Sequence, residues 1–469
     1  MNYRQLVEQY QEDLIEDLKG LLAIESIKGE STPDAPVGEG PKAALDFMLE
    51  LGARDGMTTK SVENLAGHIE YGKGAEIFGV LGHVDVVPAS GEWDTPPFEP
   101  TIQDGYIIAR GVQDDKGPTM AAYYAMKILK DQGHEFNKRL RLIIGTDEES
   151  DWECTRAYFK HEAMPDAGFA PDAAFPLIHG EKGISTFNLI QDYKETTENV
   201  SGIELISFDS GEALNVVPDT AECKLKGQNL ADVKERFEHY LKSESENGHA
   251  SISQDELTLY IEGKSAHGST PTKGEHAGHK LLKFLKDIEL DSQAQHFVEV
   301  MNKYVVDNLD GTAYDLFATH DEMGETTINS GKITYQASSG GEVGVNYRYP
   351  FGVDFDEKIE VLKSLMTESH FKVTNASGMP PHYVDSNDPL ITLLVDAYRN
   401  HVDDDREPFT IGGGTYARVL DKGVAFGAMF KDSVDTMHQK NERMKVEELI
   451  TVTTIYLEAL HRIICKDEI

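Results

Sequence analysis

The stretch Glu76–Asp85, with the sequence EIFGVLGHVD, decides the fold because it joins a predicted buried strand to a predicted metal ligand. Its apolar run ends at Gly82 and is typical of a strand that is covered on both faces. His83 follows immediately, and the carboxylate of Asp85 comes two residues later. In an α/β protein such a strand delivers His83 to the carboxyl edge of the sheet, where catalytic groups collect.

Strands and helices alternate on both sides of this stretch. Hydrophobic spacing predicts an amphipathic helix over residues 3–22 and further helices at Lys116–Asp131 and Asp151–His161. A strand is expected at Leu140–Gly145, between the last two of these helices. The alternation predicts an α/β fold, with a mixed, mostly parallel sheet flanked by helices.

The middle of the chain has a different pattern. Apolar residues alternate with polar ones along Leu257–Ile261 and again along Val343–Tyr349, as in an antiparallel sheet that is covered on one side. We therefore expect an inserted α+β domain at residues 183–381. The first domain would then consist of residues 1–182 and 382–469.

Composition narrows the function classes. A chain of 469 residues suggests two domains, and its net charge of −38 argues against nucleic-acid or anionic-membrane partners. Its three cysteines form no CxxC pair, which indicates ordinary reduced thiols. The amino terminus lacks the apolar core of a signal peptide, and no apolar run reaches about 18 residues. We expect a cytoplasmic protein that does not enter the membrane.

Acidic residues cluster at two further element boundaries. Asp114 and Asp115 stand side by side before a predicted helix, where one could cap the helix while the other binds a metal ion. Asp147, Glu148 and Glu149 follow a predicted strand, and three such acids repel one another unless cations or water neutralise them. These clusters therefore indicate either a cation site or solvated acids at the start of a helix.

Metal-assisted hydrolysis requires exchangeable ligands and a base. Carboxylate and imidazole groups suit zinc, manganese or cobalt. His83 is the first candidate ligand, and Asp85 can accept the other ring N–H of that histidine. Asp172 and His438 are weaker candidates when taken alone. The glycine run at 412–414 lacks the Lys-Ser/Thr of a phosphate loop, so nucleotide binding is not favoured.

Five segments, taken in order, resemble the co-catalytic metallopeptidase family of aminoacylases, carnosinases, peptidase T and glutamate carboxypeptidases. They are GHVDVVP at 82–88, DDKGP at 114–118, GTDEE at 145–149, PDA at 171–173 and IGGGTY at 411–416. The resemblance covers essentially the whole chain, through Met437-His438, and is strongest to the bacterial PepV-type dipeptidases.

The resemblance implies a dinuclear metal centre of two divalent ions, zinc or manganese. Asp114 would bridge them, with a cis peptide bond to the next residue. One ion would also be held by His83 and Asp172, and the other by Glu149 and His438.

The resemblance also implies the catalytic and substrate-binding groups. Glu148 would be the general base acting on a metal-bridged water, Asp85 would assist through His83, and His267 of the inserted lid domain would stabilise the oxyanion. The substrate-binding residues would be Asn215, Arg348, Gly413 and Gly414. The implied protein is a metal-dependent dipeptidase that acts on short unblocked peptides. An inserted lid of this length favours a monomer, because in PepV-type enzymes it takes the role of a partner subunit.

Three alternatives remain open on the sequence. One is an N-acyl amino acid deacylase or carboxypeptidase of the same family. The second is a non-haem iron oxygenase, whose ligand triad also contains His-x-Asp and a distant histidine. The third is a metal-binding protein without catalytic activity, against which the presence of Glu148 argues because the ligand set does not need it.

Overall fold

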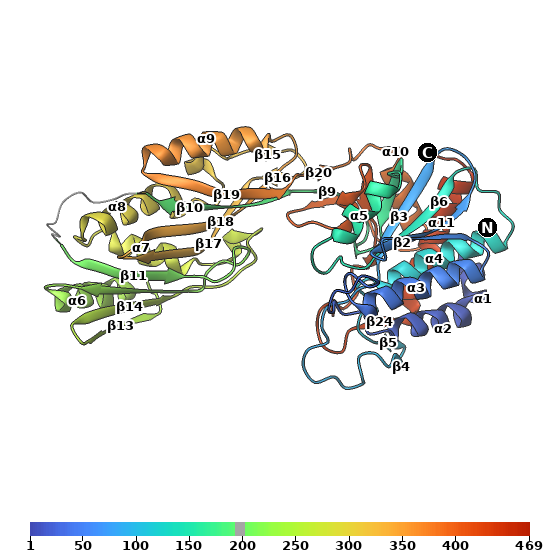
Figure 1. The fold of residues 1–469 in the computed structure, drawn as a ribbon, viewed down its shortest axis with the longest axis horizontal. Coiled ribbons are helices and arrows are strands. Elements are labelled where there is room, and N and C mark those ends of the chain that lie inside the picture. The colour runs from blue at the N-terminus through green and yellow to red at the C-terminus, as the bar shows by residue number, and fades with distance from the viewer. Residues whose placement is uncertain (193–201) are drawn as a thin grey trace. The chain divides into compact units, whose positions relative to one another are not determined.

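The computed structural model describes residues 1–192 and 202–469, which form two compact units (Figure 1). The first unit contains Met1–Gly180, Tyr383–Thr410 and Thr415–Ile469. The second unit contains Glu181–His382 and the short return segment Ile411–Gly414. The expected α/β fold class is confirmed, with one mostly parallel sheet and a separate antiparallel sheet.

The sheet of the first unit has parallel strands at its centre. In the order β6, β3, β7, β22, the neighbouring strands run parallel to one another. Antiparallel strands extend the sheet beyond β6 and beyond β22. The bounds along the sheet are β1 Thr58–Val62, β2 Ala66–Gly72, β6 Arg139–Gly145, β3 Ile77–His83, β7 Ala167–Ala170, β22 Gly423–Ala425, β9 Ile178–Glu181 and β20 His382–Tyr383, with β21 Phe409–Ile411 paired to β9.

Helices cover this sheet and share one hydrophobic core with it. Every residue of β3 is buried, as expected for a strand that is covered on both faces. The helices of this unit are α1 Tyr3–Gln9, α2 Gln11–Leu22, α3 Glu39–Arg54, α4 Lys116–Asp131, α5 Glu153–His161, α10 Pro389–Arg399 and α11 Val446–Leu460. The single helix expected over residues 3–22 is wrong, because Tyr10 leaves the helical conformation (φ −103°, ψ 2°) and donates its N–H to the Val7 carbonyl.

The second unit is an antiparallel sheet with helices on one face. Along β14, Leu257, Leu259 and Ile261 are buried while the residues between them are partly exposed. The strand order is β13 Gly248–Ser253, β14 Glu256–Glu262, β12 Thr220–Lys226, β11 Glu204–Ser210, β17 Thr327–Gln336, β18 Gly340–Tyr349, β10 Gly183–Gln191 and β19 Phe371–Met379. The covering helices are α6 Leu230–Ser243, α7 Ala277–Leu285, α8 Ser292–Val300 and α9 Phe355–Glu368, which share one hydrophobic core with the sheet.

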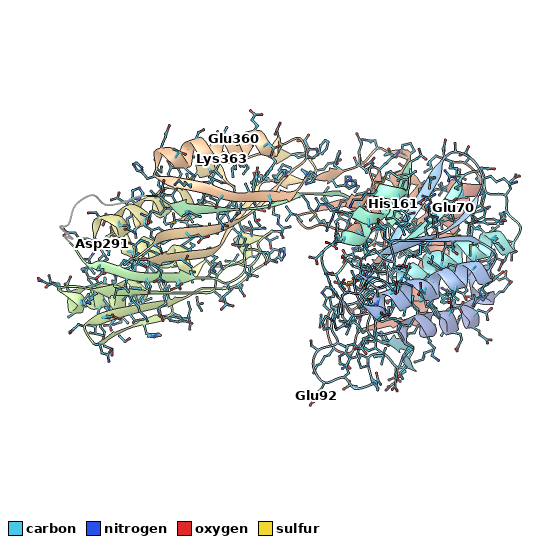
Figure 2. The ribbon with its side chains drawn as sticks, in the orientation of Figure 1. Glu70, Glu92, His161, Asp291, Glu360 and Lys363 are labelled. Atoms are coloured by element: carbon cyan, nitrogen blue, oxygen red, sulfur yellow. The ribbon has the colours of Figure 1, made fainter. Side chains whose placement is uncertain are left out.

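A capping carboxylate ties helix α8 to this sheet. Asp291, labelled in Figure 2, accepts the Ala294 N–H through Oδ1 and the Leu205 N–H through Oδ2, at 3.0 and 3.1 Å. An aspartate at this position satisfies helix-terminal donors that would otherwise lack partners.

Across the described ranges 1–192 and 202–469, no helix combines the length and the apolar character needed to cross a membrane.

Candidate metal centre

Three parallel strands bring the candidate residues of the first unit to one edge of its sheet. His83 ends β3 and pairs in register with Gly145, the last residue of β6, so the Glu148–Glu149 pair follows at the same edge. Asp172 follows β7 by two residues, and β7 is the other neighbour of β3. The strand order therefore explains why residues far apart in sequence meet here.

The first candidate ligand group contains His83, Asp114 and Asp172. His83 Nε2 lies 3.1 Å from Asp114 Oδ1 and 3.6 Å from Asp172 Oδ2, and the three ligand atoms lie within 4.8 Å of one another. Burial alone would lower the pKa of His83, but the neighbouring carboxylates, first Asp114 and then Asp172, hold it well above its usual value. The imidazole therefore lies in a strongly negative environment.

The second candidate ligand group contains Asp114, Glu149 and His438. His438 Nε2 lies 2.9 Å from Asp114 Oδ2 and 3.1 Å from Glu149 Oε1. Hydrogen bonds to Asp114 and Glu149 raise the pKa of His438 to about 10. Asp114 thus directs one carboxylate oxygen to each group. Two imidazoles and three carboxylates in this arrangement fit two divalent ions with one shared ligand, and their O/N chemistry suits zinc or manganese.

The loop that carries Asp114 is anchored by its neighbour. The Asp114–Asp115 peptide bond is cis. Asp115 occupies the N-cap position of α4, but the expectation that one aspartate caps the helix is wrong because the Asp115 side chain makes no capping bond. Its Oδ2 instead accepts the His83 N–H at 3.2 Å and the Thr119 hydroxyl at 2.9 Å. Asp115 therefore links the Asp114 loop to the end of β3.

Asp85 connects His83 with the paired glutamates. Its carboxylate accepts the backbone N–H groups of Glu148 and Glu149 at 3.2 and 3.0 Å. His83 Nδ1 lies 3.1 Å from the Asp85 carbonyl oxygen and 3.4 Å from Asp85 Oδ1. Asp85 therefore contacts the imidazole through both its backbone and its side chain, and it fixes the backbone on which Glu148 and Glu149 stand.

Glu148 is a carboxyl group in an acidic, largely buried position. Burial, together with the negative charges of Asp172, Asp114 and Glu149, raises the pKa of Glu148 to about 9 against the opposing effect of His83. Divalent cations beside these acids would favour the ionised form, which a general base needs. The Glu148 carbonyl also accepts the Trp152 indole N–H at 2.6 Å, which helps to shape this loop.

The predicted oxyanion and substrate residues lie in the second unit. His267 Nδ1 lies 2.7 Å from Ser269 Oγ and accepts the Ser269 N–H at 3.2 Å. Because a backbone N–H can only donate, the neutral ring carries its proton on Nε2. Burial and Arg348 lower the pKa of His267 and favour this neutral form. The side chain is exposed, so Nε2–H can donate to a bound molecule.

Backbone contacts join the Asn215 segment to the His267 segment. The Asn215 carbonyl accepts the Gly268 N–H at 2.6 Å, and an isolated antiparallel bridge pairs Val216 with His267. Asn329, which the sequence analysis did not identify, donates through Nδ2 to the carbonyls at both sides of Asn215, those of Leu214 and Val216. Asn215, a predicted substrate residue, and His267, the predicted oxyanion residue, are thus held on one backbone framework.

Arg348 is bonded to the glycine run at 412–414, which lies against the segment that follows His267. Arg348 on β18 donates through Nε to Asn346 Oδ1 at 2.8 Å and through Nη1 to the Gly412 carbonyl at 2.9 Å. Gly412 lies against Ser269, since a Cβ added at that glycine would come within 3.0 Å of the Ser269 Cβ. Gly413 and Gly414 continue the same segment of the second unit. The structure therefore gathers the predicted substrate residues in one unit and the predicted ligands in the other.

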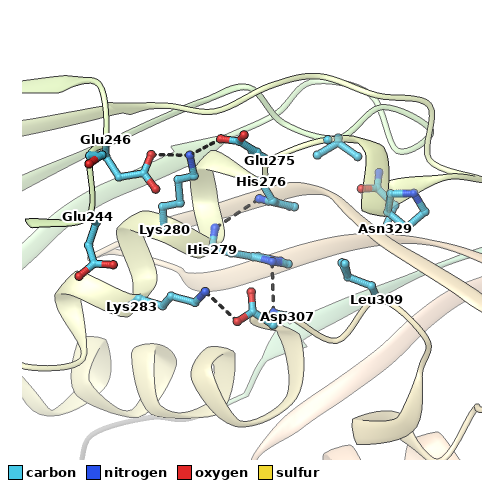
Figure 3. A pocket seen from close by; sticks show the side chains of 14 residues that line it. Glu244, Glu246, Glu275, His276, His279, Lys280, Lys283, Asp307, Leu309 and Asn329 are labelled. Carbon is cyan, nitrogen blue, oxygen red and sulfur yellow. Dashed lines mark hydrogen bonds and ion pairs between the residues drawn. The ribbon is translucent and has the colours of Figure 1, made fainter. Parts of the chain in front are cut away.

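A pocket of about 500 Å³ in the second unit is lined in part by Asn329 (Figure 3). Ion pairs from Lys280 to Glu246 and from Lys283 to Asp307 cross it. His276 and His279 stack with ring centroids 3.7 Å apart. None of the lining residues belongs to either candidate ligand group, so this pocket is separate from the candidate metal centre.

Two buried polar residues beside Asp114 escaped the sequence analysis. Gln113 and Glu442 are 3% and 1% exposed, and each bonds a segment that is distant in sequence. The only signal in the sequence is that Gln113 directly precedes Asp114 and that Glu442 follows His438 by four residues.

Comparisons with known proteins identify a family and close relatives in sequence. A family model described as peptidase family M20/M25/M40 matches residues 79–462. A protein of Staphylococcus aureus (strain bovine RF122 / ET3-1) named "Putative dipeptidase SAB1611c" is 50% identical over 469 residues, which cover 99% of this chain and 100% of that protein. The S. aureus (strain N315) protein named "Putative dipeptidase SA1572" has the same identity and coverage.

Solved structures share the fold at low sequence identity. Aminoacylhistidine dipeptidase from Vibrio alginolyticus has a TM-score of 0.57 and 14% identity, with 96% of each chain covered. Human carnosine dipeptidase 1 has a TM-score of 0.52 and 16% identity, with 97% of each chain covered. These similarities concern the fold alone.

Proposed function

The chain belongs to peptidase family M20/M25/M40, and from this membership we propose that it is a dipeptidase that acts on short peptides with free termini. Membership makes it an enzyme and a metallopeptidase, whose family binds divalent metal ions. It favours a peptidase over the iron oxygenase and the non-catalytic metal-binding protein. The named relatives favour a dipeptidase over a deacylase or a carboxypeptidase.

The observation that carries the proposal is the shared position of Asp114. Its two carboxylate oxygens lie 3.1 Å from His83 Nε2 and 2.9 Å from His438 Nε2, one in each ligand group. We assign His83 and Asp172 to one divalent ion, Glu149 and His438 to the other, and Asp114 to both. Zinc and manganese both suit this donor set.

Glu148 is the proposed general base. Bound divalent ions supply Lewis-acid polarisation of the peptide carbonyl and lower the pKa of a water molecule. A Glu148 carboxylate oxygen then takes the proton of the attacking water and later gives a proton to the leaving amine. Asp85 supports this step because its carboxylate holds the backbone N–H groups of Glu148 and Glu149. This role requires Glu148 to be ionised, which divalent ions held by the candidate ligands would favour.

Residues of the second unit are proposed to bind the substrate. His267 Nε2–H donates to the developing oxyanion, which a neutral imidazole with Nδ1 already engaged is suited to do. Arg348 pairs with the substrate carboxylate, for which its planar fork is suited, together with Asn215, Gly413 and Gly414. We further propose that residues 183–381 act as a lid on a catalytic domain made of residues 1–182 and 382–469, and that the lid closes over the substrate.

A peptide panel tests the proposal. Metal-stripped protein would be given zinc, manganese or cobalt singly, together with unblocked dipeptides, N-acetylated dipeptides, N-acetylated amino acids and tripeptides. Release of free amino acids from unblocked dipeptides alone, and only with metal, is the expected result. Cleavage confined to N-acetylated substrates would establish a deacylase instead. No cleavage of any dipeptide with any of the three ions would refute the dipeptidase assignment.

A further inference from the structure

The buried carboxylate of Glu442 accepts several backbone hydrogen bonds from the loop that carries Asp114. Glu442 Oε1 accepts the Gln113 N–H at 2.8 Å and the Asp114 N–H at 3.3 Å. Its Oε2 accepts the Gly111 N–H at 2.9 Å and the Arg110 guanidinium at 2.7 Å. Four donors converge on a side chain that is 1% exposed. A loop that contributes three N–H groups to one carboxylate has little freedom to move.

The side chain of Gln113 makes the reciprocal contact, from the Asp114 loop to the segment that carries His438. Gln113 Oε1 accepts both the backbone N–H and the hydroxyl of Thr436, at 2.9 and 2.6 Å. Gln113 Nε2 donates to the Val434 carbonyl at 2.9 Å. The side chain of Gln113, next to Asp114, therefore holds the segment that leads into His438. Glu442, four residues beyond His438, in turn holds the loop of Asp114.

We propose that Glu442 and Gln113 are positioning residues that set the distance between Asp114 and His438. The proposal rests on the assignment of these two residues as metal ligands. The Asp114 loop contacts the other segment on both sides of His438, through Thr436 before it and Glu442 after it, across more than 300 residues of sequence. The 2.9 Å spacing of His438 Nε2 and Asp114 Oδ2 is the result. Partners of this kind commonly hold metal ligands in position, and their loss costs roughly 10–100-fold in metal affinity.

Replacement of Glu442 by glutamine tests this role. An amide would turn one acceptor oxygen into a donor that faces either Gly111 and Arg110 or Gln113 and Asp114, so two bonds are lost and donors oppose donors. Glu458→Gln is the matched control, because Glu458 is also buried in the first unit but bonds Asn400 and His401, which lie outside both candidate ligand groups.

The measurement is Mn²⁺ affinity of the metal-stripped full-length chain by calorimetric titration, repeated with Zn²⁺ and without any peptide. In Glu442→Gln we expect at least one ion to bind roughly 10–100-fold more weakly, while Glu458→Gln keeps the parent affinities. Peptidase turnover of Glu442→Gln should recover as Mn²⁺ is raised, which a general folding defect would not allow.

Parent affinity for both ions in Glu442→Gln would overturn the proposal, and so would an equal loss in Glu458→Gln. If Glu442→Gln does not fold, Gln113→Ala decides, since it removes the contacts to Thr436, Val434 and Met429 but leaves Glu442 in place; parent affinities there would be equally decisive against the proposal. Because these titrations need no substrate, a parent protein that binds two ions but cleaves no dipeptide would refute the proposed function and leave this test intact.

Discussion

Asp85 holds the backbone of Glu149, accepting its N–H at 3.0 Å while Asp85 Oδ1 lies 3.4 Å from the ring of His83. The same carboxylate accepts the Glu148 N–H at 3.2 Å. One buried side chain thus touches the imidazole of one candidate ligand group and the loop that carries a ligand of the other. Glu148, the proposed base, directly precedes Glu149 on this loop, and its backbone is held by the same carboxylate.

Asp85→Asn should weaken both the contact to the His83 ring and the hold on the Glu148–Glu149 backbone. An amide cannot accept the two glutamate N–H groups with two oxygens, so we expect roughly a 10–100-fold loss in metal affinity or turnover. Metal content after dialysis and the steady-state rate would be measured together. Asp166→Asn is the control, because Asp166 also accepts a backbone N–H, that of Ile77, away from the ligands. Equal effects in both variants would refute a specific role for Asp85.

Glu148→Gln should separate metal binding from turnover. The amide is nearly isosteric but cannot take a proton, and Glu148 is not needed as a ligand, so both ions should remain bound while the rate falls about 10²–10⁴-fold. Metal analysis and dipeptide turnover on the same preparation provide the check. Substantial activity in the variant would remove Glu148 from its proposed role as base.

Arg348→Lys should affect recognition of the substrate carboxylate. Lysine keeps the charge but loses the fork that bonds Asn346 and Gly412, and it cannot pair with a carboxylate through two parallel bonds. We expect kcat/KM for an unblocked dipeptide to fall roughly 10-fold or more, in line with about 1.5–3 kcal/mol for a charged hydrogen bond. The C-terminally amidated dipeptide is the matched substrate. A variant that still distinguishes acid from amide as strongly as the parent would contradict the assignment.

His276→Asn should reduce the acid sensitivity of the second unit. Burial lowers the pKa of His276 to about 4, below its usual value near 6.5, so the unfolded chain binds this proton more readily than the folded chain. The histidine therefore contributes stability that is complete above pH 6.5 and is lost as the pH falls towards 4, on the order of 3 kcal/mol in total.

Asparagine at this position can still cap α7, as the His276 side chain does by accepting the His279 N–H. Thermal unfolding of metal-free protein between pH 4 and 7 is the measurement. A melting temperature that falls as steeply on acidification in His276→Asn as in the parent would show that this histidine does not carry the effect.

The sequence predicts those helices and strands well whose hydrophobic pattern is complete within one segment. The apolar run of Ile77–Leu81 indicates a buried strand, and Lys116–Asp131 is a helix with the predicted bounds. The ordered motifs supply the candidate ligands, and the sheet order brings together those that follow β3, β6 and β7, namely His83, Glu149 and Asp172. The break at Tyr10 was not predicted, since the apolar stripe of residues 3–22 continues through it.

Contacts between distant segments could not be predicted in this way. Glu442 is a single glutamate among many, and three of its four donors are backbone N–H groups about 330 residues earlier, which carry no side-chain signature. The same holds for Asn329, whose amide bonds two carbonyls beside Asn215. Polar residues that support a site through backbone contacts become visible only when the chain is folded.

The most direct test of the account counts the ions that turnover requires. Metal-stripped protein would be titrated with Mn²⁺, and separately with Zn²⁺, while bound ions per chain and hydrolysis of one unblocked dipeptide are measured on the same samples. The two ligand groups that share Asp114 predict that the rate reaches its plateau only when two ions are bound per chain. Full activity with no ion bound, or a plateau at a single ion with no second binding event, would contradict the dinuclear account.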